Sequence, residues 1–400
     1  MSQHTYKKII VASDSFKGSL SSLGVAEAAA KAITEVCPEC NVVKVDVADG
    51  GEGTMDALCR TLGGKKITIE VSDPLGRPVN ASYVILGDGV TAVLEMAAAS
   101  GLTLLASSER NPLKTSTYGT GQLIADALDR GCRKFLVGIG GSATNDAGMG
   151  MLQALGVRFF DVEGNLLQGR GESLELVHSI DMSSLCEGLS ESEFIVACDV
   201  DAPLYGPKGA AYVFSPQKGA DPDMVQQLDM GLKHFAGKVL SCNITSGDSS
   251  YTPGSGAAGG LGFGFIAFLN TRIERGIEMV LDAIGFDSII EKADLIITGE
   301  GRVDSQTLTG KTPFGVLKRA EKQGVPVVAI GGSVTLDPQA ALEAGFAGVY
   351  AVTPEGMPLE TAMRPDVASN NICNTVRNIL SHELCISCID RPCPGYRVDY

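Results

Sequence analysis

Six glycine-rich polar segments contain most of the residues that could do chemistry in this chain of 400 residues. Five of them follow apolar, strand-like runs or open helices, at 14–19, 48–54, 138–146, 198–201 and 298–305, and the sixth, 253–260, opens an apolar helix. In an open parallel sheet, ligands bind outside the carboxyl ends of the strands. A single glycine cluster is often an ordinary tight turn. Six polar clusters in such positions indicate a ligand site.

The side chains of these segments match the needs of phosphoryl transfer. That reaction uses backbone amides and cations around the phosphates, carboxylates that hold a divalent ion, and a base for the acceptor hydroxyl. Gly140-Gly141-Ser142 and the segment 254–260 offer amides, and Lys17 and Lys311 offer cations. The carboxylates are those of Asp14, Asp49, Asp146, Asp199, Glu300 and Asp304.

Two familiar nucleotide motifs are excluded by their context. The run 254–259 reads G-x-G-x-x-G, but the residues before it form no strand, which a nicotinamide-binding fingerprint requires. Its backbone N–H groups at the start of a helix still suit an anion. Gly310 and Lys311 resemble the end of a Walker A loop, but Ser305 stands where that loop needs its first glycine.

Histidine-based chemistry is also disfavoured. The four histidines, His4, His178, His234 and His382, lie outside all six segments. None of them has a cysteine, histidine or glutamate neighbour at the spacing of a metal site or a nucleophilic dyad. We expect each to be a surface residue or a satisfied core residue.

Composition and charge exclude several classes of partner. With 32 Lys and Arg against 47 Asp and Glu, the formal charge of −15 disfavours nucleic acid and anionic membrane surfaces. No window approaches the length of an apolar membrane span, and the first residues lack the apolar core of a signal peptide. The eleven cysteines show no repeated spacing that would indicate a disulfide framework. These features predict a cytoplasmic protein, and they leave a homodimer open.

The elements that must position the six segments follow an α/β pattern. A strand at 7–12, a helix at about 21–36 and a strand at 41–47 form a βαβ unit, which implies a parallel sheet. Continuous apolar runs at 294–298, 325–330 and 348–352 predict further buried parallel strands. Between these ends, strands at 82–86, 91–94, 135–139 and 194–197 alternate with helices at 121–130, 147–155 and 222–236.

This pattern predicts an α/β fold of two domains. Residues 1–71 and 288–380 would form a discontinuous, doubly wound, Rossmann-like parallel sheet domain, and residues 72–287 an inserted α/β domain. The ligand would then lie in the cleft between the domains. One continuous sheet is the alternative. Residues 381–400 are expected to form a C-terminal tail, because their three cysteines lack a fourth zinc ligand.

Taken in order, the six segments resemble the bacterial-type glycerate kinase family (glycerate 2-kinases). The shared motifs span about residues 8–380 and read DSFKGS, ADGGEGT, GIGGSATND, VACDVD, PLYGP, GAAYVF, PQKGA, PGSGAAGG and ITGEGRVDSQT. The resemblance implies two α/β domains, the second inserted into the first, and transfer of phosphate from ATP to the 2-hydroxyl of D-glycerate, giving 2-phosphoglycerate and ADP. Ala147 stands where the family usually has glycine, and Ala202 where it usually has asparagine.

Three residues are the candidate catalytic groups: Asp199, Lys17 and Asp49. Asp199 ends the apolar run 194–198, so we expect it to be buried and to act as the base, with Asp14 and Asp49 as alternatives. The competing interpretation is that Asp199 caps the turn before Pro203. The predicted substrate-binding residues are Asp14, Ser15, Lys17 and Asp199. Lys17 would hold the substrate carboxylate or a phosphoryl oxygen, unless it is a solvated turn lysine.

The nucleotide phosphates are expected to bind backbone amides. The predicted nucleotide-binding residues are Gly140, Gly141, Ser142, Asn145, Gly254, Gly256 and Gly259. Mg²⁺ would be reached through water by Glu300 and Asp304, with Asp49 as runner-up, unless the two acids merely cap the turn before the Pro313 helix. The alternative function is a non-catalytic sensor of phosphate or sugar acids. The carboxylates argue against it, because they would repel such ligands.

Overall fold

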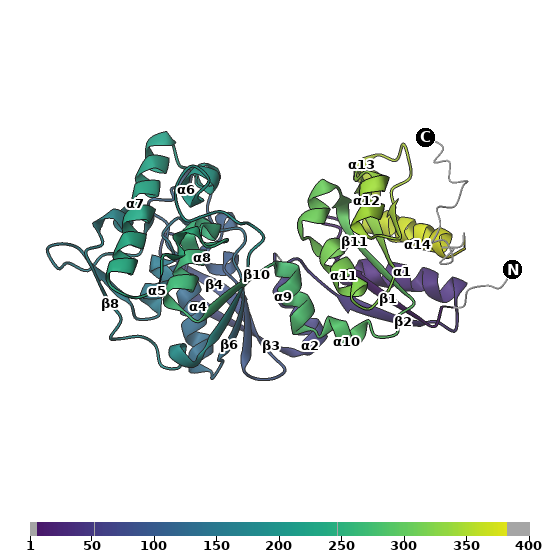
Figure 1. Ribbon diagram of the computed structural model, residues 1–400, viewed down its shortest axis with the longest axis horizontal. Helices are drawn as coiled ribbons and strands as arrows, with labels where there is room; N and C mark the ends of the chain where they lie inside the picture. Colours follow the sequence, from purple (N-terminus) through teal and green to yellow (C-terminus); the bar gives the residue numbers. More distant parts are fainter. Residues whose placement is uncertain (1–5, 52, 246, 382–400) are drawn as a thin grey trace. The chain divides into compact units, whose positions relative to one another are not determined.

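The computed structural model describes residues 6–51, 53–245 and 247–381, which form two compact units (Figure 1). Unit 1 combines the two ends of the chain, up to Val47 and from Gly285 onward, and unit 2 is the continuous stretch Ala48–Ile284. The first boundary lies earlier than the predicted residue 71. The reason is that helix α2 (Thr54–Leu62) and strand β3 (Gly64–Ser72) pack in unit 2, where β3 pairs with β4 over its full length.

Unit 1 is built on a sheet of five parallel strands in the order β13-β12-β11-β1-β2. These strands are β1 (Lys8–Ser13), β2 (Asn41–Asp46), β11 (Leu295–Val303), β12 (Val327–Val334) and β13 (Gly348–Ala351). The chain winds outward from β1 in both directions, so the strand order switches between β1 and β11. In doubly wound sheets this switch point is where ligands bind.

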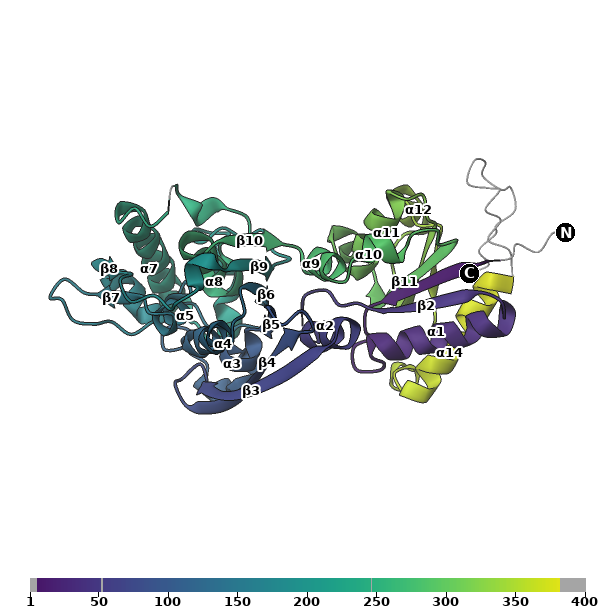
Figure 2. The ribbon, with the colours of Figure 1, turned by 90° about the horizontal axis from the view of Figure 1, so that it is seen from below.

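Helices cover both faces of the unit 1 sheet, as its continuous apolar strands require. Figure 2 shows α1 (Ser22–Val36) and α14 (Pro365–Ser381) on one face, and α10 (Phe286–Ile289), α11 (Thr312–Glu321) and α12 (Pro338–Ala344) on the other. A short helix α13 (Leu359–Ala362) precedes α14. Ile9, Val11, Ile297 and Ile330 form the core beneath α1 and α14. The predicted α/β class is confirmed.

Unit 2 contains a six-stranded mixed sheet in the order β10-β9-β6-β5-β4-β3. Its strands are β3, β4 (Pro78–Leu86), β5 (Thr91–Glu95), β6 (Lys134–Gly138), β9 (Glu193–Ala197) and β10 (Thr271–Glu274). Strands β5, β6, β9 and β10 are parallel, whereas β3 and β4 run antiparallel at one edge. The sequence prediction missed β3 and β10, the two edge strands. A small hairpin, β7 (Arg158–Phe160) and β8 (Ser179–Asp181), lies apart from the sheet.

The two faces of this sheet are covered by different helices (Figure 2). Helices α2 and α9 (Gly276–Ala283) pack on one face. The other face is covered by α3 (Ala97–Ser100), α4 (Tyr118–Asp129), α5 (Met149–Ala154) and α8 (Ala257–Phe268). Helices α6 (Ala210–Phe214) and α7 (Pro222–Ser241) lie outside this second layer. The rings of Phe135 and Phe194 stack at 4.6 Å across β6 and β9, and Phe265 of α8 packs on Phe194. This aromatic core fixes the strand that leads to Asp199.

Left-handed residues delay the regular part of two helices in unit 2, and α5 begins later than the sequence predicts. Helix α5 starts at Met149 instead of Ala147, since Ala147 and Gly148 have φ angles of 51° and 75°. Within α8, Ala258, Gly259 and Gly260 are also left-handed, so regular helix begins only after Gly260. Left-handed backbone favours glycine. The conformation of Ala147 therefore accounts for glycine being usual there in the family that the sequence resembles.

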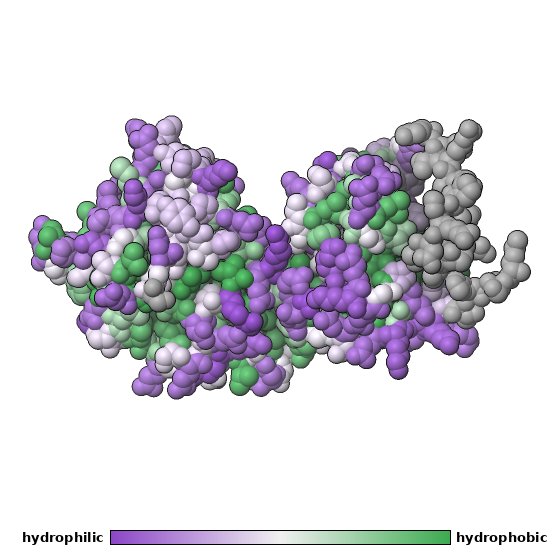
Figure 3. All heavy atoms as spheres, in the orientation of Figure 1, coloured by the Kyte–Doolittle hydropathy of each residue, from purple (hydrophilic) through white to green (hydrophobic). Residues whose placement is uncertain are grey.

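Hydrophilic residues are spread over the face of both units drawn in Figure 3. None of the helices in the described part of the chain is long and apolar enough to cross a membrane. The predicted tail at 381–400 lies outside the described residues, apart from Ser381 at the end of α14.

Candidate functional site

The loop after β1 places three predicted residues at the switch point of unit 1. Asp14 is buried: its N–H donates to the carbonyl of Gly299 on β11 (2.9 Å), and its carboxylate accepts from the N–H of Ser15 (2.6 Å). The buried ring of Phe16 anchors the loop, while Lys17 is exposed. The structure thus brings Asp14, Ser15 and Lys17 together on a loop fixed at both ends, with the lysine at the surface.

Glu300, on the neighbouring strand β11, is held by partners within unit 1. Its carboxylate accepts from the hydroxyl of Thr307 (2.6 Å) and lies 3.4 Å from the ammonium of Lys311. Burial raises the pKa of Glu300 above its usual value, and the Thr307 hydrogen bond and the charge of Lys311 offset part of this rise. Lys311 therefore serves first as the counter-ion of Glu300.

Asp304 caps the 3-10 turn Ser305–Thr309. One carboxylate oxygen accepts from the N–H of Gln306 (2.9 Å), and the other lies 3.4 Å from Nε of Arg302. Asp304 thus takes the predicted capping role, at the turn directly before helix α11, which contains Pro313.

Glu300 and Asp304, the predicted magnesium residues, have a protein partner at both oxygens of each carboxylate. A carboxylate oxygen with one partner can still accept a hydrogen bond from a water bound to an ion. Within the described part of the chain, no group of three or more histidine, cysteine, aspartate or glutamate residues could hold a metal ion. Mg²⁺ in nucleotide sites needs only one or two carboxylates besides the phosphates. The predicted runner-up, Asp49, belongs to a second acid pair, which it forms with Asp199.

That pair, Asp49 and Asp199, lies in unit 2. A carboxylate oxygen of Asp199 accepts from the N–H of Gly276, the first residue of α9 (3.1 Å). The pKa of Asp199 is raised, first by desolvation of its carboxyl group and then by the negative charge of Asp49, while the Gly276 hydrogen bond and Arg275 act in the opposite direction. A carboxylate of raised pKa is a stronger base.

The predicted burial of Asp199 is wrong. Strand β9 ends at Ala197, and Asp199 is an exposed residue of the following loop. Its pKa still rises because the carboxyl group itself is turned toward α9 and partly desolvated there. The hydrogen bond to Gly276 also differs from the predicted cap of the turn before Pro203. An edge strand and helix that the sequence did not reveal, β10 and α9, supply the partner.

Close backbone contacts hold the loop of Asp49 against the start of α9. A Cβ atom added at Gly276 would lie 1.9 Å from the carbonyl oxygen of Asp49. One added at Gly50 would lie 2.5 Å from Cα of Gly276 and 2.9 Å from Cβ of Ala197. The first glycine of the segment 48–54 thus allows three chain segments to meet beside Asp199.

The loop after β6 has backbone N–H groups that are accessible to an anion. Gly140 and Gly141 are exposed, and a Cβ added at Gly140 would meet no atom within 4 Å. Among the described residues, nothing accepts a hydrogen bond from the N–H groups of Gly140, Gly141 and Ser142. Three successive amides with a left-handed residue, here Gly141 at φ 74°, can form an anion-binding concavity.

The second predicted set of phosphate-binding amides, in the segment 254–260, donates hydrogen bonds within unit 2. The N–H of Gly256 donates to the carbonyl of Ala202 (2.9 Å), and those of Ala257 and Gly260 donate to Gly254 and Gly256. A Cβ added at Gly259 would lie 2.0 Å from the carbonyl oxygen of Thr144. Gly254 is likewise buried, against Cys198 and Ile273. These glycines support close packing behind the β6 loop, and the left-handed turn gives no helix N-terminus for an anion.

The structure reveals a buried polar group that the sequence prediction missed. Lys218 is 2 % exposed, and its ammonium donates to the hydroxyl of Ser142 and the carbonyl of Thr144, each at 2.6 Å. Asn145 is fully buried, and neither polar atom of its side chain has a partner in the structure. Lysine is rarely buried, so composition gave no signal. The sequence signal was the position of Lys218 in the run PQKGA, which the resembled family shares.

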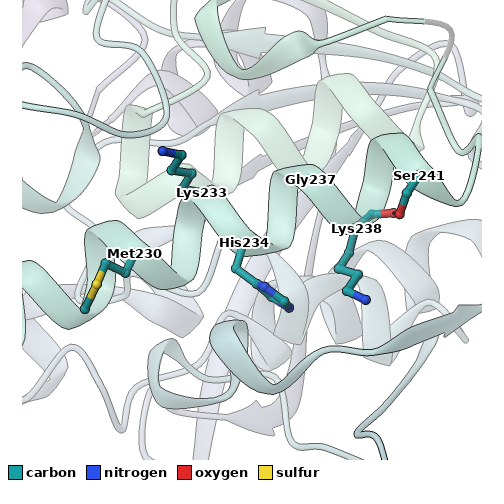
Figure 4. Close-up of a pocket in the computed structure, with 6 residues that line it drawn as sticks. All are labelled: Met230, Lys233, His234, Gly237, Lys238 and Ser241. Atoms are coloured by element: carbon teal, nitrogen blue, oxygen red, sulfur yellow. The ribbon is translucent and has the colours of Figure 1, made fainter.

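A separate hollow of about 440 Å³ lies on helix α7. It is lined by Met230, Lys233, His234, Gly237, Lys238 and Ser241, which all come from this helix (Figure 4). His234 is exposed, as predicted for a histidine without catalytic partners, and a ring nitrogen lies 2.8 Å from the carbonyl oxygen of Val177. None of the predicted site residues contributes to this hollow.

Comparison with known proteins decides the family. Residues 9–383 match the model of the glycerate kinase family. The chain belongs to this family. A protein named glycerate kinase from Bacillus subtilis (strain 168) is 49% identical over 358 residues, which cover 89% of this chain and 92% of that protein. A glycerate 2-kinase from Escherichia coli (strain K12) is 45% identical, with 93% and 97% covered.

A solved structure of the family has the same fold. The crystal structure of a putative glycerate kinase 2 from Salmonella typhimurium LT2 matches with a TM-score of 0.85 and 44% identity. The match covers 94% of this chain and 98% of that chain. The α/β architecture of both units is therefore that of a glycerate kinase.

The close contact at Gly50 predicts a difference between two glycines of one loop. Both Gly50 and Gly53 have positive φ, but a Cβ added at Gly53 would meet no atom within 4 Å. We expect Gly53→Ala to lower the free energy of unfolding by about 1 kcal/mol through backbone strain alone. Gly50→Ala should lower it by at least ~2 kcal/mol more, because Gly276 and Ala197 must move.

Urea unfolding followed by circular dichroism measures both variants, since the chain has no tryptophan. Equal losses for Gly50→Ala and Gly53→Ala would show that the contact with Gly276 is unimportant.

Proposed function

We propose that the protein transfers the γ-phosphoryl group of ATP to the 2-hydroxyl of D-glycerate, giving 2-phosphoglycerate and ADP. The observation that carries the proposal is the 45% identity, over nearly the whole chain, with an E. coli protein named glycerate 2-kinase. The geometry supports it, because unit 1 presents an exposed lysine at a switch point and unit 2 presents an acid pair and open amides.

Asp199 is the proposed general base. A hydroxyl that attacks phosphorus must lose its proton during or after transfer, and a carboxylate within hydrogen-bond reach can accept it. The Gly276 N–H orients one oxygen of Asp199, and the charge of Asp49 makes the carboxylate more basic. Asp49 would therefore act by raising the pKa of Asp199, in addition to any contact that Asp49 itself makes with the ligands.

Lys17, with Asp14 and Ser15, is proposed to bind the substrate. The ammonium of Lys17 is exposed beside the switch point, where it could hold the carboxylate of glycerate or a transferred phosphoryl oxygen. Buried Asp14 fixes the loop through its bonds to Gly299 and Ser15. Its role in this arrangement is to orient the neighbouring Ser15 and Lys17.

The phosphates of ATP are proposed to bind the amides of Gly140, Gly141 and Ser142. Mg²⁺, when bound, would neutralise phosphate charge during transfer. Asp49, the predicted runner-up, is the proposed carboxylate that would reach such an ion through water, which leaves Asp199 as the base.

The sensor alternative gains nothing from these observations. The curated relatives described above are named as kinases, and an anion sensor would be weakened by the acid pair. A cytoplasmic location and a homodimer stay predictions of the sequence.

Asp199→Asn tests the base. The amide keeps the shape and the hydrogen bond from Gly276, but it accepts no proton, so we expect kcat to fall by about 10²-fold or more. The matched control is Asp201→Asn, an exposed acid two residues further on, which should stay within about twofold of wild type. Initial rates with D-glycerate and Mg-ATP measure both variants, and ³¹P NMR identifies the product.

A folded Asp199→Asn enzyme with normal turnover would move the role of base to Asp49. Formation of 3-phosphoglycerate by the wild type would contradict the proposed regiochemistry.

The raised pKa of Asp199 predicts a pH profile. Only the deprotonated carboxylate accepts a proton, so kcat/KM falls as the pH drops through this pKa. Because desolvation and Asp49 raise the pKa above 3.8, the fall should begin at higher pH than for an ordinary aspartate. Asp49→Asn removes one negative charge and should shift the acid limb to lower pH. An acid limb at the same pH in Asp49→Asn would show that the two acids do not interact.

Lys17→Met tests the substrate site. Methionine keeps the length of the side chain but removes the charge, so we expect kcat/KM for D-glycerate to fall by about tenfold or more. Lys322→Met, at an exposed position of unit 1, is the control and should have little effect. A change of less than about threefold in Lys17→Met, under ~1 kcal/mol, would assign Lys17 to the solvated surface.

A further inference from the structure

A buried polar cluster lies directly behind the Gly140–Ser142 loop of unit 2. Lys218 ends the 3-10 turn Pro216–Lys218, and its side chain reaches the residues that follow β6. The ammonium donates to the Ser142 hydroxyl and to the Thr144 carbonyl, and the hydroxyl of Thr144 has no partner among the described residues. We call Ser142, Thr144, Asn145 and Lys218 the Lys218 cluster.

The charge in this cluster is held against a considerable desolvation penalty. Burial lowers the pKa of Lys218 to about 7, and the negative charge of Asp146 only partly offsets the effect. Asp146 is itself fully buried and accepts hydrogen bonds from Thr117, Gly148 and Gly150. A buried, perturbed lysine beside an open loop is typical of a functional site.

The hydrogen bond from Lys218 makes the hydroxyl of Ser142 available as a hydrogen-bond donor. Its oxygen accepts from the ammonium, so the hydrogen of the hydroxyl group is left to donate elsewhere. Among the described residues, the hydrogen bond from Lys218 is the one found at this hydroxyl. Ser142 is 9 % exposed, at the border between the buried cluster and the exposed Gly140 and Gly141.

The side chain of Asn145 is a second, independent sign of a ligand or an ordered water behind this loop. It is fully buried, yet its amide group has neither donor nor acceptor partner. A buried amide without partners costs free energy unless something binds to it. Native structures leave few such groups unpaired.

We propose that Lys218 is a positioning residue that orients the hydroxyl of Ser142 as a hydrogen-bond donor to a phosphate group of ATP at the Gly140–Ser142 loop. This inference rests on the proposed function, and it adds a residue to which no role was assigned. A donor that receives a charge-assisted hydrogen bond is polarised and binds an anion more strongly. The protonated form of Lys218, which a bound phosphate favours, also puts a positive charge behind the three amides.

The first test compares ATP affinity in wild type, Lys218→Met and Ser142→Ala, measured by isothermal titration calorimetry without glycerate. Methionine matches lysine in length, but it makes no hydrogen bond to Ser142 and carries no charge. We expect Lys218→Met to raise the Kd of ATP by tenfold or more, and Ser142→Ala to raise it by at least threefold. The control is Lys233→Met, on the outer side of α7 (Figure 4), which should leave the Kd unchanged.

The double variant separates positioning from a structural role. If Lys218 acts through Ser142, the double variant should bind ATP no more weakly than Lys218→Met alone, because the hydroxyl no longer matters once it is misoriented. The KM for D-glycerate should stay within twofold in Lys218→Met. A general loss of structure would instead change the KM values of both substrates.

Binding within twofold of wild type in Lys218→Met, or fully additive effects in the double variant, would overturn the proposal. If Lys218→Met does not fold, the test rests on Ser142→Ala alone. An ATP affinity of Ser142→Ala equal to that of the wild type would then overturn the proposal. The binding assay contains no glycerate. A wild type that binds ATP but does not phosphorylate D-glycerate would therefore refute the proposed function without touching the role of Lys218.

Discussion

The parallel pairing of buried strands is the constraint on which both units depend. A parallel strand buried on both faces must be followed by a crossover, so every such strand delivers the chain to the same edge of its sheet. In unit 1 this edge holds the loops after β1 and β11, and in unit 2 it holds those after β5, β6 and β9. The polar segments that follow these strands lie at these edges, because their side chains and amides cannot be satisfied within the sheet.

Glycine serves two opposite purposes at these edges. At Gly50, Gly256, Gly259 and Gly276 a side chain would collide with another backbone, so these residues allow chain segments to pack in contact. At Gly140 nothing lies near the missing side chain, and the backbone itself is accessible. Packed glycines and open glycines look the same in sequence. The three-dimensional contacts therefore divide the predicted phosphate site, leaving the β6 loop as the accessible half.

Strong local signals allowed much of the fold to be predicted, and non-local contacts explain the rest. The continuous apolar strands β1, β6, β9 and β11 were recognisable, because burial on both faces leaves an unambiguous pattern. Strand β10 and helix α9 were missed, and the partner of Asp199 was missed with them. Likewise, Lys218 reaches Ser142 across 76 residues of sequence. Neither contact follows from spacing or from the type of residue.

The distribution of charge reconciles an acidic protein with anionic ligands. The formal charge of −15 opposes ATP and glycerate at long range, but screening confines this effect to about 8 Å at physiological ionic strength. Groups within that distance of a bound ligand then decide affinity. In unit 1, Lys17 is an exposed cation beside the switch point, and Lys311 is the counter-ion of Glu300. In unit 2 the nearby donors are the amides of the β6 loop, with the ammonium of Lys218 behind them. Attraction to an anion thus depends on a few donors close to it and not on the net charge of the chain.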